Sequence, residues 1–354
     1  MSTFRVTAEP LTILEHPNAD ALELAQVGLY RAVVPKGVYK TGEYAVYIPE
    51  QAVLPADLIE ELGLTGRLAG PAKDRVKAVR LRGELSQGIV CHPEALANVD
   101  LSHVDVEDVD FSGVLGIAKW VPPIPPAMAG EVEPAPDLLP WVDIENLKRH
   151  PDVFEPGEEA VVTEKIHGTC CLLTWHADGR VQVSSKGVGG RGLALQESET
   201  NLYWRTVRGH GIPDAAQSLA EQLGATRVGI FGEVYGTGVQ DLAYGASGSG
   251  PLPGYAVFDV SVEINGQVRW IDPELVLPAS VPRVTVLYRG PFDLDAVQKL
   301  ADGTETISGQ GLHLREGVVI RPAVERHSDV LGGRAIAKAV SDAYLTRKNG
   351  TEFE

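Results

Sequence analysis

The sequence predicts an α+β protein in which a small β-barrel precedes a larger domain of antiparallel sheets and helices. Short β-like runs separated by Gly, Pro and Asn fill residues 1–95, as in small barrels. An acidic, proline-rich stretch spans residues 96–146. Over residues 147–354, strands alternate with only a few helices. Few connections in this last region are long enough for repeated βαβ crossovers, so antiparallel pairing is favoured.

In the first region the sequence predicts one helix at 56–63 and strands at 4–8, 22–27, 30–34, 43–48 and 76–81. Residues 96–146 are expected to form an extended, semi-rigid linker, because proline removes backbone donors and fixes φ. A short helix is predicted at 143–154, opening the last region. Two further helices are predicted at 197–209 and 214–224. Strands are predicted at 160–165, 168–176, 180–186, 227–236, 254–264, 266–271, 283–290, 317–322 and 334–341.

The composition is that of an ordinary globular chain. Its 354 residues are 44% hydrophobic and 22% charged, which suits two domains. The sequence contains no apolar run of about 18 residues, so no membrane span is predicted, and we see no secretory signal at its start. Three cysteines cannot build a disulfide framework, so we expect a reduced, cytoplasmic protein without membrane association.

The charge distribution leaves room for a nucleic-acid partner. The net charge of −17 opposes a polyanion overall, but a local basic surface can still bind phosphates. The run 73–82 is basic, and its candidate nucleic-acid contacts are Lys73, Arg75, Lys77, Arg80 and Arg82. A solvated strand face is the alternative interpretation of this run.

Familiar phosphate-binding loops are not found. Gly187, Gly189 and Gly192 satisfy G-x-G-x-x-G after a strand, but no convincing βαβ unit surrounds them. We interpret that stretch as a flexible loop. The pattern G-x-x-x-x-G-K-[ST] does not occur in the sequence.

A lysine at a strand end is the strongest chemical candidate. Lys165 lies between two apolar strands and is followed by His167 and Gly168. Such a lysine is either a solvated edge residue or, where burial or nearby cations lower its pKa, a nucleophile. A glycine three residues later would let a ligand approach the backbone.

Four later segments make the nucleophile interpretation more specific. Glu233 follows one apolar strand and Phe258 lies within another. Glu316 heads a third strand, and Lys338 lies inside a fourth. Each residue alone is ordinary for a core strand, whereas all of them in this order are not.

This order resembles the covalent nucleotidyltransferase superfamily of ATP-dependent ligases and capping enzymes. Lys165-Ile166-His167-Gly168 resembles the nucleophile motif, and Phe231-Gly232-Glu233 the third motif. Phe258-Asp259 resembles the aromatic motif, residues 316–321 the fourth, and the Lys338 strand the fifth. His167 followed by Thr169 is most similar to the phage-type RNA ligase 2 family and the kinetoplastid editing ligases.

Two positions depart from the family pattern. The fifth motif often carries two lysines on one strand, and Ile336 stands in the first of these places. A basic residue is also expected between the first and third motifs. Lys186 and Arg191 both remain candidates for it, with Lys186 favoured by its position in the strand.

The first region has a resemblance of its own. Residues 16–20, 22–24, 81–83 and 86–88 are similar to segments of OB-type tRNA-binding domains. An OB barrel ahead of a K-x-H-G core, with few residues after the fifth motif, resembles the Deinococcus-type RNA ligase clade. Classical DNA ligases and capping enzymes instead carry an OB domain after that motif.

The resemblance implies an OB-like nucleic-acid-binding domain at 1–95, a linker at 96–146 and an adenylyltransferase domain at 147–354 with ATP-grasp-like antiparallel sheets. The activity implied is ATP-dependent RNA ligation in RNA repair. The enzyme would seal 3′-hydroxyl and 5′-phosphate ends or nicks through lysyl-AMP and RNA-adenylate intermediates. We expect a monomer.

The resemblance also assigns roles to residues. Lys165 would be the nucleophile, and Lys338 would contact the α-phosphate and lower the pKa of Lys165. Phe258 would stack on adenine, Glu233 would bind a ribose hydroxyl, and Glu316 would hold Mg²⁺ or Mn²⁺ through water. The remaining ATP contacts implied are Glu164, Ile166, His167, Gly168, Lys186 and Arg191.

Three alternatives remain at this point. A DNA-nick ligase would use the same chemistry. A non-catalytic OB-type RNA-binding protein with a degenerate ligase core is opposed by the intact Lys165, Glu233, Glu316 and Lys338. A capping guanylyltransferase is disfavoured by His167.

Overall fold

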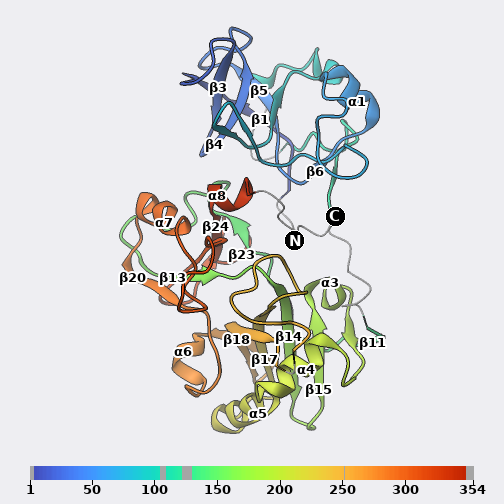
Figure 1. Cartoon of the computed structure of the whole chain (residues 1–354), viewed down its shortest axis with the longest axis vertical. Coiled ribbons are helices and arrows are strands. Elements are labelled where there is room, and N and C mark those ends of the chain that lie inside the picture. Colours follow the sequence, from blue (N-terminus) through green and yellow to red (C-terminus); the bar gives the residue numbers. More distant parts are fainter. Residues whose placement is uncertain (1–3, 104–108, 122–129, 251, 348–354) are drawn as a thin grey trace.

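The computed structural model describes residues 4–103, 109–121, 130–250 and 252–347. Figure 1 shows an N-terminal domain, in blue, next to a larger domain that runs from green to red. The mixed α+β architecture predicted from the sequence is confirmed. Among the described residues, none of the helices combines the length and the apolar character needed to cross a membrane.

The N-terminal domain is built from short antiparallel strands, as predicted. One sheet has the order β1-β5-β9 and a second the order β2-β3-β4, beside a β7–β8 hairpin. The bounds are β1 Thr7–Pro10, β2 Thr12–Glu15, β3 Leu22–Val27, β4 Tyr30–Pro35, β5 Tyr44–Ile48, β6 Ala52–Val53, α1 Ala56–Glu61, β7 Val79–Leu81, β8 Glu84–Ser86 and β9 Ile89–Cys91. Two 3₁₀ turns follow, at Glu94–Leu96 and Leu101–His103.

The core of this domain continues well past residue 95. Phe111, Leu115 and Ile117 are buried in the same cluster as Val46 and Ile48. The Phe111 N–H donates to the Val6 carbonyl at 2.8 Å. The two-residue strand β10 (Ala118–Lys119) pairs with β6. The described residues 109–119 are therefore part of a packed domain and not of the extended linker expected from the proline-rich, acidic stretch 96–146, because a few apolar side chains suffice to anchor them.

The end of the expected linker belongs to the larger domain. β11 (Val132–Pro134) pairs with β16 (Leu193–Leu195), and β12 (Glu145–Asn146) pairs with β24 (Ala337–Val340). The most proline-rich part of the expected linker, residues 122–129, lies outside the described residues. The first domain therefore extends past residue 95, and the larger domain begins before residue 146.

Two large sheets and the small sheet β22-β23 form the larger domain. The seven-stranded sheet has the order β11-β16-β15-β14-β17-β18-β19, and the five-stranded sheet the order β12-β24-β21-β13-β20. All neighbours pair antiparallel except β12 and β24, which confirms the predicted preference. The remaining bounds are β13 Glu159–Lys165, β14 Thr169–His176, β15 Val181–Ser185, β17 Arg227–Tyr235, β18 Gly254–Ile264, β19 Gln267–Ile271, β20 Val286–Pro291, β21 Gly317–Pro322, β22 His327–Ser328 and β23 Gly333–Arg334.

Helices cover one face of each large sheet (Figure 1). α4 (Leu202–Gly209) and α5 (Ile212–Leu223), both predicted, bury apolar side chains against the seven-stranded sheet. α7 (Leu294–Ala301) packs in the same way on the five-stranded sheet. Three short helices complete the domain: α3 (Lys186–Gly189), α6 (Pro273–Val276) and α8 (Asp342–Leu345). The uncovered faces of the sheets supply the candidate site.

Local signals explain where the helix predictions were wrong. Residues 143–154 form β12 and turns, because the Asn146 side chain accepts from the Lys148 N–H at 2.9 Å and Pro151 interrupts the segment. α7 was not predicted, although Asp293 caps its first turn by accepting from the Ala296 N–H at 2.7 Å. The stretch expected as a flexible glycine loop forms α3, which Ser185 caps.

Candidate active site

Strand register brings Lys165 and Lys338 to one face of the five-stranded sheet. Lys165 pairs with Gly317, while Val319 pairs with both Thr163 and Lys338. Side chains alternate along a strand and residues opposite each other share a face. Lys165, Thr163 and Lys338 therefore lie on the same face, opposite the face that packs against α7.

The Lys165 ammonium is ion-paired in this site. Its Nζ lies 2.7 Å from Oε1 of Glu316, the residue that precedes β21. Burial lowers the pKa of Lys165, but the carboxylates of Glu316 and Glu233 outweigh burial and hold that pKa above its usual value. The expected lowering of the Lys165 pKa by Lys338 is therefore wrong for this state, because two carboxylates surround the ammonium.

One carboxylate oxygen of Glu316 makes no hydrogen bond to the described residues. Its side chain is 9% exposed, and Oε2 is buried without a hydrogen-bond partner among the described residues. A buried carboxylate oxygen left unpaired is costly and suits a cation or a bound water. The described residues contain no group of three or more His, Cys, Asp or Glu that could hold a metal by themselves.

Glu233 approaches from the other sheet. It lies on β17 opposite Cys170 of β14, whose Sγ donates to Glu233 Oε2 at 3.2 Å. Burial raises the pKa of Glu233 to about 7, against the lowering effect of Lys165. Glu233 and Glu316 thus enclose the Lys165 ammonium from two sheets.

Lys338 is the second cation of the site. Burial, and then the nearby ammonium groups of Lys165 and Lys186, lower the pKa of Lys338 to about 8. Lys186 opens α3 and pairs with Asp143 at 2.8 Å. Arg191 is exposed beyond that helix. Lys186 therefore lies just past β15 and not within the strand as predicted, and it is exposed like Arg191. Of the two, it is Lys186 whose charge acts on Lys338.

The Glu164 side chain does not face the site. Strand alternation sends it to the opposite face of β13 from Lys165. There its carboxylate is buried and accepts from the Thr306 N–H at 3.0 Å. The expectation that Glu164 contacts the nucleotide is therefore wrong for its carboxylate, which holds the loop after α7.

Phe258 lies where two strands lose register. On β17, Phe231 pairs with Asp259 and Gly232 with Val257, so Phe258 is the extra residue of a β-bulge. Bulges re-aim side chains and are frequent next to active sites. Phe258 packs, half-buried, against a cluster that includes Ile166.

Gly168 is required by the protein's own packing. A Cβ at this position would lie 2.3 Å from the Val234 carbonyl oxygen and 2.9 Å from Cγ of Glu233. The glycine was expected to admit a ligand to the backbone. The structure shows that the missing side chain instead lets β17 pack closely, so that Glu233 can lie near Lys165.

His167 is held by protein groups on every side. Nε2 lies 2.6 Å from Oδ1 of Asp241, and the Tyr344 hydroxyl lies 2.8 Å from Nδ1. The His167 backbone N–H donates to the Tyr244 hydroxyl at 2.7 Å. Burial lowers the pKa of His167, so the ring is neutral, donating through Nε2 and accepting at Nδ1.

The basic run of the N-terminal domain does not form a single face. Arg75 is buried at 3% exposure, and its guanidinium lies 4.0 Å from the centre of the Trp120 ring. Arg75 is therefore a core residue, and its predicted contact with nucleic acid is wrong. Lys73, Arg80 and Arg82 are exposed and Lys77 is half-buried. Arg80 also donates to Oγ1 of Thr346 at 3.0 Å, which links the two domains.

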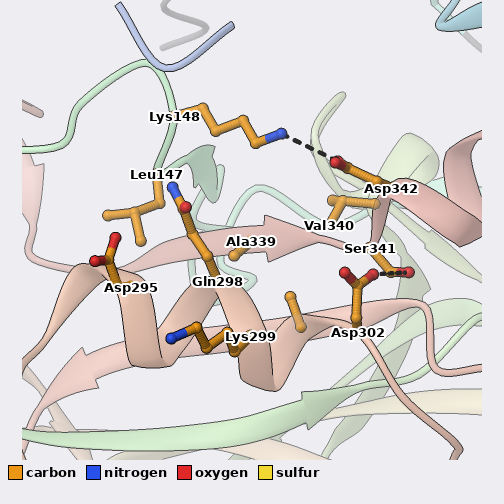
Figure 2. Close-up of a pocket in the computed structure, with 11 residues that line it drawn as sticks. Leu147, Lys148, Asp295, Gln298, Lys299, Asp302, Ala339, Val340, Ser341 and Asp342 are labelled. Atoms are coloured by element: carbon orange, nitrogen blue, oxygen red, sulfur yellow. Dashed lines mark hydrogen bonds and ion pairs between the residues drawn. The ribbon is translucent and has the colours of Figure 1, made fainter. Parts of the chain in front are cut away.

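A pocket of about 430 Å³ lies on the face of β24 opposite Lys338. Figure 2 shows its walls: α7 on one side, and the chain at 147–148 and 339–342 on the other. Lys148 reaches across to Asp342 at 3.0 Å, and the Ser341 hydroxyl donates to Asp302 at 2.7 Å. The charged groups at this end of the pocket are thus used to hold the start of α8.

Several residues around the site were not predicted. Asp241, Tyr344 and Arg347 reach His167 or its partners, and Asp143 pairs with Lys186. None of them lies in a recognisable pattern with Lys165. Only tertiary contact between residues as far apart as 167 and 344 reveals them.

Comparison with known proteins agrees with this arrangement. An RNA ligase family model matches residues 158–340, more than half of the chain, and an OB-fold domain model matches residues 6–93. No curated protein sequence matches significantly.

Solved structures of the Naegleria gruberi RNA ligase share the fold. One, with pyrophosphate, is 23% identical with a TM-score of 0.75, covering 97% of this chain and 98% of that one. A variant with ATP and manganese is 24% identical with a TM-score of 0.76, covering 96% and 98%. A variant with AMP and manganese is 23% identical with a TM-score of 0.76, covering 97% and 98%. The family match over the whole sheet region that carries Lys165, Glu233, Glu316 and Lys338 leads to one conclusion: this chain belongs to the RNA ligase family.

Proposed function

We propose that the protein is an ATP-dependent RNA ligase that joins a 3′-hydroxyl to a 5′-phosphate and works as a monomer in RNA repair. One observation carries the proposal. Lys165 and Glu316 form a 2.7 Å ion pair on one sheet, Glu233 faces them from the other sheet, and Lys338 shares the face of Lys165. A lysine nucleophile, two carboxylates and a second cation are thereby gathered within one site.

In the first step, the Lys165 ammonium gives up one proton, for which Oε1 of Glu316 is the acceptor within hydrogen-bond reach. The neutral Nζ then attacks the α-phosphorus of ATP, and the bond to pyrophosphate breaks. Nζ loses a second proton to solvent, and a lysyl-AMP phosphoramidate remains. AMP then passes to the RNA 5′-phosphate, which regenerates Lys165. Finally the 3′-hydroxyl attacks the activated phosphate and AMP leaves.

The other residues would bind the nucleotide. Lys338 and Lys186 would neutralise phosphate charge, which phosphoryl transfer requires more than it requires covalent help. Phe258 would stack on adenine, with the adjoining Ile166 as part of the same apolar wall, and Glu233 would accept a ribose hydroxyl. Arg191, exposed beyond α3, would contact the phosphates as well.

A divalent metal fits the donor set. Mg²⁺ or Mn²⁺ would be held by the unpaired Oε2 of Glu316, directly or through water. When bound, the metal would supply charge neutralisation on the phosphates. Cys91, Cys170 and Cys171 are free thiols, which supports a reduced, cytoplasmic setting.

The test is a covalent adduct. Protein incubated with α-labelled ATP and Mg²⁺ or Mn²⁺ should form an acid-stable labelled species, and Lys165→Ala should not. Lys299→Ala, a change on α7, is the matched control and should retain labelling. An adduct that persists in Lys165→Ala would remove Lys165 as the nucleophile. Labelling by GTP in place of ATP would favour a capping enzyme.

A second measurement separates RNA from DNA ligation. Nicks that carry RNA or DNA only at the terminal 3′-hydroxyl nucleotides should be sealed at different rates, because the 2′-hydroxyl distinguishes the two polymers. We expect sealing to require ribonucleotides at the 3′-hydroxyl end of the nick. Equal sealing rates would favour a DNA-nick ligase.

A further inference from the structure

Four side chains, those of His167, Asp241, Tyr344 and Arg347, form a cluster that begins two positions after Lys165. His167 contacts Asp241 and Tyr344, as described above. Arg347 donates to both carboxylate oxygens of Asp241, at 3.0 and 3.2 Å, and its guanidinium lies 3.7 Å from the centre of the Tyr344 ring. Both polar ring atoms of His167 are thus occupied by protein groups.

This cluster joins three distant parts of the chain. His167 comes from the turn after Lys165, Asp241 from the loop after β17, and Tyr344 and Arg347 from the segment after β24. That last segment is itself anchored by two bonds described above, Ser341 to Asp302 and Lys148 to Asp342 (Figure 2). It is therefore a fixed support for the His167 ring.

We propose that Tyr344 and Asp241 are positioning residues of the ligase, which hold the His167 ring and thereby fix the main chain that carries the Lys165 nucleophile. The proposal rests on the proposed function. A single residue, the buried Ile166, separates Lys165 from His167, whose ring is held by the cluster. Loss of one anchor would let the Lys165 ammonium move relative to Glu316 without opening the fold.

The consequence is specific to individual steps. Small misplacement of a nucleophile strongly slows the step that uses it. Lys165 forms a bond in the first step and breaks it in the second, whereas the final joining step uses only the 3′-hydroxyl and the activated RNA. Positioning defects should therefore slow adenylylation and leave sealing of pre-adenylylated RNA nearly intact.

The experiment uses the full chain with Tyr344→Phe and Asp241→Asn. Tyr344→Phe keeps the ring beside His167 and Arg347 but removes the hydroxyl. Asp241→Asn keeps a hydrogen-bond acceptor for His167 but removes the charge that Arg347 pairs with. Tyr288→Phe, which deletes a hydroxyl bond to the Pro291 carbonyl on β20, is the matched control.

Single-turnover adenylylation, its half-saturating ATP concentration, sealing of pre-adenylylated RNA and thermal unfolding are measured for each variant. We expect both cluster variants to slow adenylylation about tenfold or more. The half-saturating ATP concentration and sealing of pre-adenylylated RNA should stay within about threefold of the wild type, and Tyr288→Phe should match the wild type throughout.

Two results would overturn the proposal: adenylylation at the wild-type rate in both variants, or an equal fall in every step together with a lower melting temperature, which indicates a purely structural role. A wild-type protein that forms no adduct with ATP would instead refute the proposed function, so the two failures are distinguishable.

Discussion

Lys338 on β24 and Lys165 on β13 point to one face of the sheet from the two sides of β21, and burial together with the Lys165 charge lowers the pKa of Lys338 from 10.5 to about 8. Two ammonium groups that repel each other on one sheet face oppose folding at neutral pH. The arrangement is useful only once a polyanionic ligand lies between them. The repulsion between the two lysines therefore lowers the stability of the fold, and the protein retains it because the site needs both charges.

Lys338→Met should raise the melting temperature at pH 7 by on the order of 2–5 °C while abolishing ligation. Below pH 8 the wild-type fold must hold a charged Lys338. Between about pH 8 and 10 the folded state loses that proton while the unfolded state keeps it, so wild-type stability rises with pH.

The difference between Lys338→Met and wild type should accordingly shrink over that window in thermal melts. Lys299→Met on α7 controls for the general effect of removing a lysine. A Lys338→Met advantage that is the same at pH 7 and pH 10 would contradict this account.

The carboxylates that enclose Lys165 should be indispensable. Glu233→Ala and Glu316→Ala are each expected to slow ligation at least about 100-fold, equivalent to about 2.7 kcal/mol of transition-state stabilisation. The physical reason is the loss of a buried anionic partner beside the nucleophile. Steady-state sealing assays check this, with Glu159→Ala at the exposed start of β13 as control. Activity within tenfold of the wild type in either variant would count against its assignment to the site.

The exposed cations of the first domain should contribute to RNA binding. Reversing the charge of Lys73, Arg80 and Arg82 should flatten the dependence of log Kd on log salt by up to about 2, because fewer counterions are released. Fluorescence anisotropy with labelled RNA at several salt concentrations measures the slope. Reversal of Lys36 and Lys40, also exposed on this domain, is the control. An unchanged slope would show that the run 73–82 does not contact phosphates.

A truncation that removes the first domain must be made at the domain boundary that the structure shows. A chain lacking residues 1–95 would expose Phe111, Leu115 and Ile117, so it should aggregate, whereas a chain starting at residue 130 should fold. The latter also loses the Arg80–Thr346 bond and the bond from Lys148 to Gln87. It should seal 5′-phosphate ends less well than the full chain, and pre-adenylylated ends with a smaller loss. If the truncated chain sealed both substrates as well as the full chain does, this domain would be excluded from RNA binding.

The sequence predicted the strands because their apolar runs and turns follow local rules. Lys165, Glu233, Glu316 and Lys338 were singled out by the resemblance of their order to a known superfamily and not by local rules. In the structure Lys165 ends β13 and Glu316 precedes β21, whereas Glu233 lies within β17. The Glu164 carboxylate and the Arg75 side chain were placed wrongly, because the face a side chain occupies depends on sheet packing. Adjacency to Lys165 does not turn the Glu164 carboxylate toward the site, and membership of a basic run does not expose Arg75.

Contacts between distant residues could not be predicted from the sequence for a second reason. The bond between Tyr344 and His167 joins positions 177 residues apart, and nothing in either local sequence selects the other. The domain limits were similarly obscured, since the acidic composition of residues 96–146 hides the few apolar residues that anchor 109–119 to the first domain.

The tight contact of Gly168 with Val234 changes how substitutions in this motif should be interpreted. An alanine there would separate β14 from β17 and carry Glu233 away with its strand. Inactivity of such a variant would report the spacing between two strands and say nothing about whether the glycine touches a nucleotide. A measurement of nucleotide affinity on Gly168→Ala is therefore interpretable only beside a crystal structure of the same variant.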